Sequence, residues 1–196
     1  MSYKNDFKNC LDGLFESLCD VSDWMYENPE LGFEEFKTSK YLVDYIQKNS
    51  KSVNYPSHGL ETAFDITFGE EGPLTVICVE YDALPEIGHA CGHNIIATAS
   101  IGAGLSLKDI ASKLGIRVKL LGTPAEEGGG GKIILINEGA FEDASCSMMI
   151  HPGYEDVVNP TFTTIQQYTV EYFGKDAHAA GAPDQGINAL DAQIQL

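Results

Sequence analysis

The feature that most constrains the fold is a short, largely apolar run at residues 74–79. A strand buried on both faces carries such a run, because neither side of it meets water. Strand-like segments follow at 116–121 and 145–150, and helical segments separate them at 95–114 and 132–138. This alternation predicts an α/β fold, a mixed sheet that contains parallel strands and carries helices on both faces.

Two amphipathic helices are predicted before this region. Apolar residues recur at helical spacing over 7–25, and the pattern stops near Asn28-Pro29, because proline disfavours helix in the residue before it. A second helix is predicted over 38–48, with a buried stripe of its own. An alternating strand over 62–68 then leads into the apolar run.

The pattern changes again near Thr164. An alternating strand is predicted over 165–173 and an amphipathic helix over 187–196. We therefore expect one domain over 1–164 and the beginning of a small α+β domain over 165–196. The last helix has neither a glycine cap nor a following proline, so we expect the chain to be a fragment of a longer protein.

The charge balance argues against two classes of partner. The formal net charge is -17, from 12 basic and 29 acidic residues, and the basic residues are scattered. Nucleic acid needs many contacts from Lys or Arg to phosphate, and an anionic membrane surface would repel the chain. The N-terminus lacks the apolar stretch of a signal peptide, and no apolar run has the length of a membrane span. The five cysteines are odd in number and far apart. We expect a cytoplasmic protein with reduced thiols.

Ligand-type side chains collect where the predicted strands end. In an open α/β sheet, functional sites form outside the carboxyl ends of the strands, so these side chains are expected to share one edge. The candidates are Asp82, Cys91, His93, Glu126, Glu127 and His151.

Cys91-Gly92-His93 joins two good ligands through a flexible residue. Thiolate and imidazole both suit zinc and similar divalent ions, and glycine lets the backbone turn so that both side chains converge. Two alternatives stay open from the local sequence: a buried cysteine beside a loop histidine, or a Cys–His nucleophilic pair. No separate residue that would orient such a pair stands out.

Glu126 and Glu127 place two adjacent carboxylates in a loop after a strand, followed by four glycines. One carboxylate could bind metal while its neighbour acts as a base, although an exposed acidic turn is the simpler alternative. The glycines do not form a phosphate loop, because Glu126 stands where that motif needs glycine and Ile133 replaces its Ser/Thr. The Gly102-Ala103-Gly104 segment likewise lacks a full dinucleotide fingerprint.

The local sequence around the other histidines gives little evidence for a ligand role. In isolation, His151 could simply cap a strand end, and His178 could be a surface residue. His58 and His89 show no partner pattern, and we treat both as non-ligands.

Several segments, taken in order, resemble the di-metal peptidases related to aminoacylase and carboxypeptidase G. The resemblance is greatest to the amidohydrolase branch with aminobenzoyl-glutamate hydrolase, the auxin-conjugate hydrolases and the M20 domain-containing dipeptidases. It runs from about Trp24 to the end of the chain. The matching segments are Asn28-Pro29-Glu30-Leu31-Gly32-Phe33-Glu34-Glu35, Glu80-Tyr81-Asp82-Ala83-Leu84-Pro85, Gly88-His89-Ala90-Cys91-Gly92-His93-Asn94, Gly122-Thr123-Pro124-Ala125-Glu126-Glu127-Gly128, His151-Pro152 and His178-Ala179-Ala180.

The resemblance implies a role for each candidate. Cys91 would bridge two metals, and His93, Glu127 and His151 would complete the ligands within this chain. Glu126 would be the general base, and Asp82 would orient a ligand histidine, which is a common role for such carboxylates. His178 would contact substrate from a lid domain, often across a dimer. The resemblance also implies a further ligand histidine, which would lie downstream of Leu196.

The resemblance therefore implies an incomplete catalytic domain over 1–164 and the beginning of a lid or dimerisation domain over 165–196. The reaction would be hydrolysis of an amide in a dipeptide or N-acyl amino acid, by metal-activated water with Glu126 as base. Two divalent ions are expected, zinc first from the Cys and His ligands, with manganese or cobalt as alternatives. The full-length protein is expected to be a homodimer acting on a small molecule. Two rival hypotheses stay open: a catalytically inactive truncated relative that serves as a binding module, and a hydrolase with Cys91 as nucleophile.

Overall fold

One mixed sheet of four strands lies at the centre of the fold, in the order β1-β3-β2-β4. The strands are β1 (Asp65–Phe68), β2 (Leu74–Val79), β3 (Arg117–Gly122) and β4 (Ala144–Met148). β2 pairs in parallel with both β3 and β4, and β1 pairs antiparallel with β3. The carboxyl ends of the three parallel strands therefore meet at one edge, as the sequence predicted.

The computed structural model describes residues 2–158, 160–161, 163–164, 166 and 168–196. They divide into two compact units, 1–154 and 155–196, which are described separately. The boundary expected at residues 164–165 stays a prediction.

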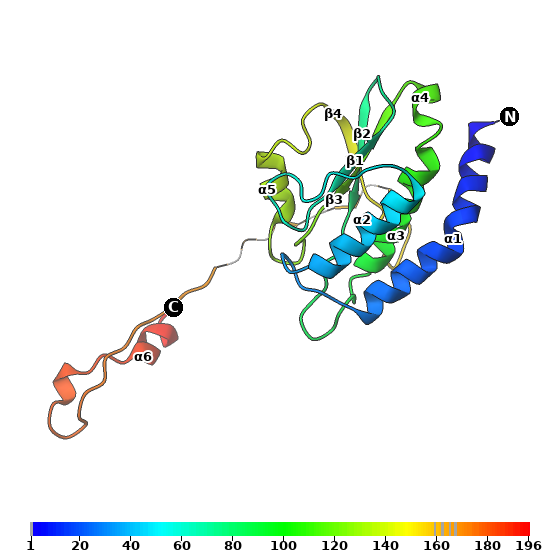
Figure 1. Cartoon of the computed structure of the whole chain (residues 1–196). Helices are drawn as coiled ribbons and strands as arrows, with labels where there is room; N and C mark the ends of the chain where they lie inside the picture. Colours follow the sequence, from blue (N-terminus) through cyan, green and yellow to red (C-terminus); the bar gives the residue numbers. More distant parts are fainter. Residues whose placement is uncertain (1, 159, 162, 165, 167) are drawn as a thin grey trace. The chain divides into compact units, whose positions relative to one another are not determined.

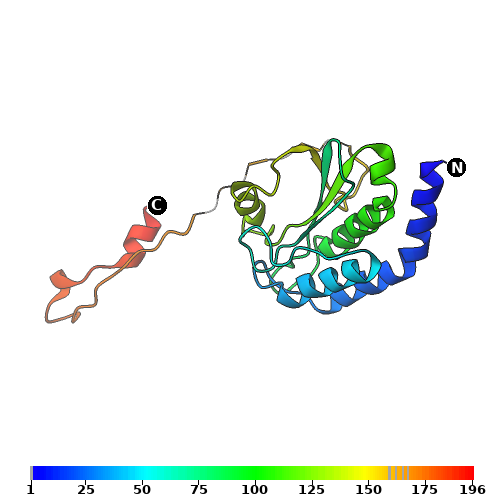
Figure 2. The same ribbon diagram turned by 45° about the horizontal axis from the view of Figure 1, so that its top comes forward.

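Helices cover both faces of the sheet, which confirms the predicted fold class (Figures 1 and 2). α1 (Tyr3–Glu27), α2 (Phe36–Asn49) and α3 (His93–Leu107) lie on one side, and α5 (Gly131–Asn137) lies on the other. α1 ends beside Asn28, whose side-chain amide donates to the carbonyl oxygen of Trp24 at 2.8 Å. Its buried residues Leu18, Val21 and Met25 recur at helical spacing, so α1 presents one apolar stripe to the core.

Alternation along the strands divides the core between these two faces. In β2, Ile77 and Val79 join the core under α1, α2 and α3, whereas Val76 and Cys78 join the smaller core that includes Leu135 of α5. Successive residues of a strand point to opposite faces, so an apolar run supplies both cores at once. This accounts for the continuous apolar character of residues 74–79.

Two sequence predictions need correction. The helix expected over 95–114 is two helices, α3 and α4 (Ala111–Leu114). The N–H of Lys108 donates to the carbonyl oxygen of Leu105, and that of Ile110 donates to the carbonyl oxygen of Leu107. Hydrogen bonds to the third residue back thus replace the α-helical pattern at this point, and Ile110 is buried in the core. The strand expected over 165–173 is absent at its described residues, 166 and 168–173, while 165 and 167 lie outside the described residues. A strand needs a partner for its backbone groups, and none is paired with these residues here.

The unit formed by residues 155–196 carries a bridge between Lys175 and Ile187, a short 3-10 helix (Pro183–Gln185) and α6 (Ala189–Ile194). Asn188 caps α6, because its side-chain oxygen accepts from Leu190 N–H at 3.1 Å. The helix predicted over 187–196 is therefore present with shorter bounds.

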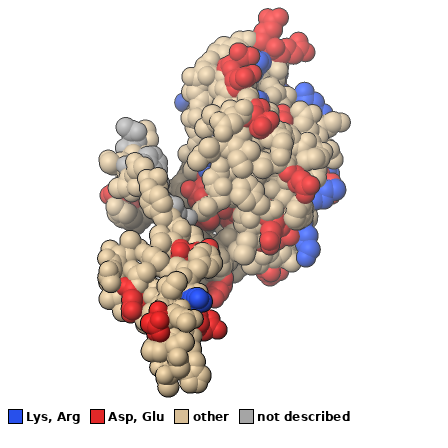
Figure 3. All heavy atoms as spheres, turned by 90° about the vertical axis from the view of Figure 1, so that its left-hand side faces the viewer, with Lys and Arg blue, Asp and Glu red and all other residues tan. Residues whose placement is uncertain are grey.

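The described residues include no helix that is both long and apolar enough to cross a membrane. On the face shown in Figure 3, acidic side chains are scattered and basic side chains form no continuous patch.

Candidate metal centre

His93 is held in one orientation at the first turn of α3. Its side chain is 1% exposed, and Nδ1 lies 2.8 Å from the Asp82 carbonyl oxygen and 3.1 Å from Asp82 Oδ1. When the ring is neutral and Nδ1–H donates to Asp82, the lone pair of the ring is on Nε2. Burial lowers the pKa of His93, but the hydrogen bond and charge of Asp82 outweigh it, so the net shift is upward.

The backbone before His93 needs a glycine. Gly92 has φ 80, and a Cβ there would lie 2.9 Å from Pro152 Cγ. The flexible residue predicted between Cys91 and His93 is thus required both by its backbone angle and by its neighbour.

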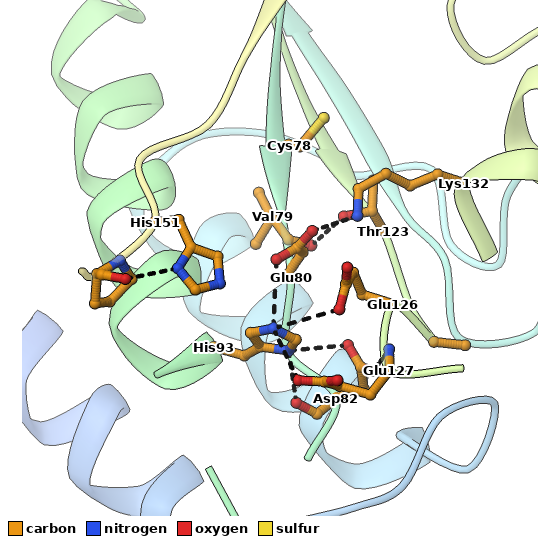
Figure 4. A network of polar contacts seen from close by, with 12 residues as sticks. Cys78, Val79, Glu80, Asp82, His93, Thr123, Glu126, Glu127, Lys132 and His151 are labelled. Atoms are coloured by element: carbon orange, nitrogen blue, oxygen red, sulfur yellow. Dashed lines mark hydrogen bonds and ion pairs between the residues drawn. The ribbon is translucent and has the colours of Figure 1, made fainter. Parts of the chain in front are cut away.

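Three carboxylates surround Nε2 of His93 (Figure 4). Glu80 Oε2 lies 3.5 Å from it, Glu127 Oε1 3.8 Å and Glu126 Oε2 3.9 Å. Nε2 and Glu80 Oε2 are buried and have no hydrogen-bond partner. Because lone pairs that face one another in a buried site repel, these atoms could hold a cation among them.

Two overlapping groups of ligand atoms fit a metal ion: Glu80, His93 and His151, and His93, Glu126 and Glu127. The atoms of each group lie within 4.8 Å of one another. His151 follows β4, and its ring lies edge-on to that of His93 with centroids 6.0 Å apart. Its Nδ1 lies 2.8 Å from the Pro152 carbonyl oxygen, so Nδ1–H donates there and Nε2 is left for a ligand role.

Asp82 connects two of the strand ends. Besides facing His93, it accepts the backbone N–H of Glu127 on Oδ2 at 2.8 Å. Burial raises the pKa of Asp82, but the hydrogen bonds from His93 and Glu127 outweigh this effect and lower it. An ionised Asp82 therefore positions both His93 and the loop that carries Glu127.

The two adjacent glutamates differ in exposure. The Glu126 side chain is 43% exposed and that of Glu127 is 22% exposed. Partial burial, followed by the negative charge of Glu80, raises the pKa of Glu126. Glu126 is thus the carboxylate that meets solvent more freely.

Cys91 is half-buried and belongs to neither group of ligand atoms. Its thiol lies against the Glu127 carboxylate, and this contact, together with burial, raises the pKa of Cys91 to about 11. A raised pKa disfavours the thiolate that a nucleophile needs, whereas a divalent cation nearby would favour it.

His178 lies in the other unit, 155–196, where its Nδ1 accepts the backbone N–H groups of Ala180 at 3.2 Å and Gly181 at 2.9 Å. The roles predicted for it and for the ligands above stay predictions.

Glu80 and Lys132 are not among the site residues predicted from the sequence. Glu80 is 1% exposed, and its Oε1 pairs with the ammonium group of Lys132, at the start of α5. The sequence did contain a signal for Glu80. Glu80 and Asp82 stand two residues apart after a strand, so their side chains can lie on the same side of an extended chain.

The chain is similar to hydrolases of known activity. It is 38% identical to the Xaa-Arg dipeptidase of Mus musculus over 198 residues, which cover 94% of this chain and 46% of the relative. The chain belongs to the M20 family of peptidases and amidohydrolases. It is also 31% identical to one chain of the p-aminobenzoyl-glutamate hydrolase of Escherichia coli, over 88% of this chain and 40% of that protein. This M20 chain spans about half the length of the curated relatives it matches.

Solved structures show the same fold. The aminobenzoyl-glutamate utilization protein of Klebsiella pneumoniae has a TM-score of 0.72 at 24% identity, over 96% of this chain and 58% of that one. A Bacillus subtilis protein described as a dinuclear metal binding peptidase of the M20 family has a TM-score of 0.62 at 24% identity, over 69% and 42% of the two chains. No family model matches the chain. The family predicted from the motifs is confirmed.

Proposed function

We propose that this chain belongs to a metal-dependent hydrolase that cleaves an amide bond in a dipeptide or N-acyl amino acid. The observation that carries the proposal is the convergence of three carboxylates on the unpartnered Nε2 of buried His93. Lys132 offsets the charge of only one of these carboxylates, Glu80, and a divalent ion would offset the rest.

The ligand atoms that these side chains offer also suit a divalent ion. His93 and His151 offer imidazole nitrogens, Glu127 offers a carboxylate, and Cys91 offers a thiol beside it. Nitrogen, oxygen and sulfur ligands together favour zinc, with manganese or cobalt as alternatives. When bound, two such ions would activate water and polarise the amide carbonyl as Lewis acids.

Glu126 acts as the general base in this proposal. Its carboxylate is the more exposed of the adjacent pair, so it can reach a water molecule at the centre. It takes a proton from the attacking water and then delivers a proton to the leaving amine. Glu127 is a ligand, and Asp82 fixes it through its backbone N–H and fixes His93 through Nδ1.

The substrate class comes from the chemistry that the relatives share. Their names describe a dipeptidase for Xaa-Arg, a hydrolase of p-aminobenzoyl-glutamate and a deacetylase of N-acetyl-L-cysteine. Each of these substrates is an amide formed by the nitrogen of an amino acid. We infer the same small-molecule class here, with His178 as a substrate contact and a homodimer as the full assembly.

The test uses the protein expressed from its complete gene. Metal content is measured, and hydrolysis is assayed with an Xaa-Arg dipeptide, p-aminobenzoyl-glutamate and an N-acetyl amino acid. We expect at least one of these amides to be cleaved, a chelator to abolish the activity, and added zinc or manganese to restore it. Activity that a chelator leaves unchanged would overturn the proposal, as would a metal-loaded protein that cleaves none of the three.

A further inference from the structure

Glu80 is a buried carboxylate with only one of its oxygens paired. It follows β2, its side chain is 1% exposed, and Oε1 forms the ion pair with Lys132. Oε2 has no hydrogen-bond partner and points toward His93 Nε2 (Figure 4). Leaving a charged oxygen buried and unpartnered costs free energy, so a site that keeps one calls for a cation.

The separation between Glu80 and His93 matches that of two ligands on one ion. With metal–ligand bonds of about 2.0–2.2 Å in a tetrahedral site, neighbouring ligand atoms lie about 3.3–3.6 Å apart. Glu80 Oε2 lies 3.5 Å from His93 Nε2, within this range. Glu127 Oε1 and Glu126 Oε2 lie at 3.8 and 3.9 Å, somewhat farther away.

His151 completes a three-residue set with these two. Glu80, His93 and His151 come from the end of β2, the start of α3 and the segment after β4, and one ligand atom from each lies within 4.8 Å of the others. Because the set is drawn from separate elements around one sheet edge, the fold itself brings these three side chains together.

Lys132 limits how Glu80 can bind. Its ammonium group occupies Oε1, so Oε2 alone is free for a metal. Its positive charge also offsets one of the three carboxylates near His93, which reduces their mutual repulsion.

We propose that Glu80 binds a metal ion through Oε2, in addition to the ligands predicted from the sequence, and that Lys132 is a positioning residue for it. This inference rests on the proposed metal-dependent function. The competing explanation is an ion pair that only ties α5 to β2, and the experiment separates the two.

The experiment titrates metal-stripped protein, expressed from the complete gene, with Co²⁺ and follows the visible absorption of the bound cobalt. Zn²⁺ affinity is measured in parallel by calorimetry. Glu80→Gln keeps the size of the side chain but replaces an anionic ligand by a neutral one. We expect this variant to lower the metal affinity of one site by more than about 100-fold and to change the cobalt spectrum. Residues that only support a ligand usually have a smaller effect on affinity. Lys132→Met should weaken binding by about 10–100-fold and keep the wild-type spectrum.

A matched control and a second variant complete the design. Asp65→Asn removes another buried carboxylate, one whose contacts are Asn54 and His58, and should leave the cobalt spectrum unchanged. The double variant Glu80→Gln with Lys132→Met leaves no unpaired buried charge, so it keeps the test valid if a single variant does not fold. It should show the altered spectrum of Glu80→Gln.

The possible results are distinct. A wild-type spectrum and affinity in Glu80→Gln, or in the double variant, would show that Glu80 is not a ligand and that the ion pair is only structural. If wild-type protein binds metal and hydrolyses amides in that case, this inference fails and the proposed function stands. If wild-type protein binds no metal, both fail.

Discussion

Glu35 Oε1 accepts the backbone N–H of Ala125 at 2.8 Å, a contact that spans 90 residues of sequence. Glu35 is fully buried, and its other oxygen accepts from Thr62 Oγ1 at 2.9 Å. Ala125 has φ 56, in the left-handed region that alanine rarely adopts, and it directly precedes Glu126. The Glu35 carboxylate therefore holds a strained residue in place next to the proposed base.

Replacing Glu35 with alanine should lower both stability and turnover. Glu35→Ala leaves the Ala125 N–H and the Thr62 hydroxyl unpaired in a buried site, and we expect the free energy of unfolding to fall by about 1–3 kcal/mol. Glu35→Gln should recover most of it, because the amide oxygen can accept from Ala125 and the amide nitrogen can donate to Thr62. Urea unfolding of both variants checks this. Equal losses in the two variants would show that hydrogen bonding is not the cause.

The two adjacent glutamates should respond differently to the same change. Glu126→Gln keeps its shape but cannot accept a proton, so we expect turnover to fall by about 10²–10⁴-fold with nearly unchanged metal content. Glu127→Gln should instead lower metal content. Steady-state kinetics and elemental analysis of the two proteins measure these effects. The division of roles is wrong if both variants lose metal equally or if Glu126→Gln stays active.

Cys91 is expected to act as a ligand. Its pKa of about 11 leaves the thiol protonated and weakly nucleophilic at neutral pH in the absence of a cation. Cys91→Ala should therefore reduce metal affinity, and no acyl adduct should appear on Cys91 by mass spectrometry during turnover. Cys19→Ala, at an exposed cysteine, is the matched control and should bind metal normally. A covalent adduct on Cys91 together with chelator-resistant activity would support the nucleophile hypothesis.

Gly131 offers a test of how tightly the glutamate loop is packed. A Cβ at Gly131 would lie 1.9 Å from the Pro124 carbonyl oxygen, so Gly131→Ala must displace backbone beside Ala125 and lower the melting temperature. Gly13→Ala is the opposite case, because Gly13 lies in α1 with nothing within 4 Å of its added Cβ. It should stabilise the protein by about 0.5–1 kcal/mol through helix propensity. Differential scanning calorimetry measures both melting temperatures. A shift of the melting temperature in the same direction for both variants would contradict this prediction.

The sequence by itself determined the elements whose signals are local. The apolar run at 74–79 and the helical periodicity at 7–25 predicted β2 and α1, because side chains alternate every two residues in a strand and repeat every 3.6 in a helix. Strand polarity then placed the candidates Asp82, His93, Glu126, Glu127 and His151 near one sheet edge. The break at 108–110 was missed, because it depends on which side chains the core accepts.

Tertiary structure alone decided the contacts between distant segments. The sheet order places β2 between β3 and β4, and in this order Glu80, His93 and His151 lie within reach of one ion. The pairing of Glu80 with Lys132 spans 52 residues, and that of Glu35 with Ala125 spans 90. No short-range sequence pattern predicts such pairs, because an isolated glutamate is expected to be exposed to solvent. Only the folded chain buries each glutamate and places its partner within hydrogen-bonding distance.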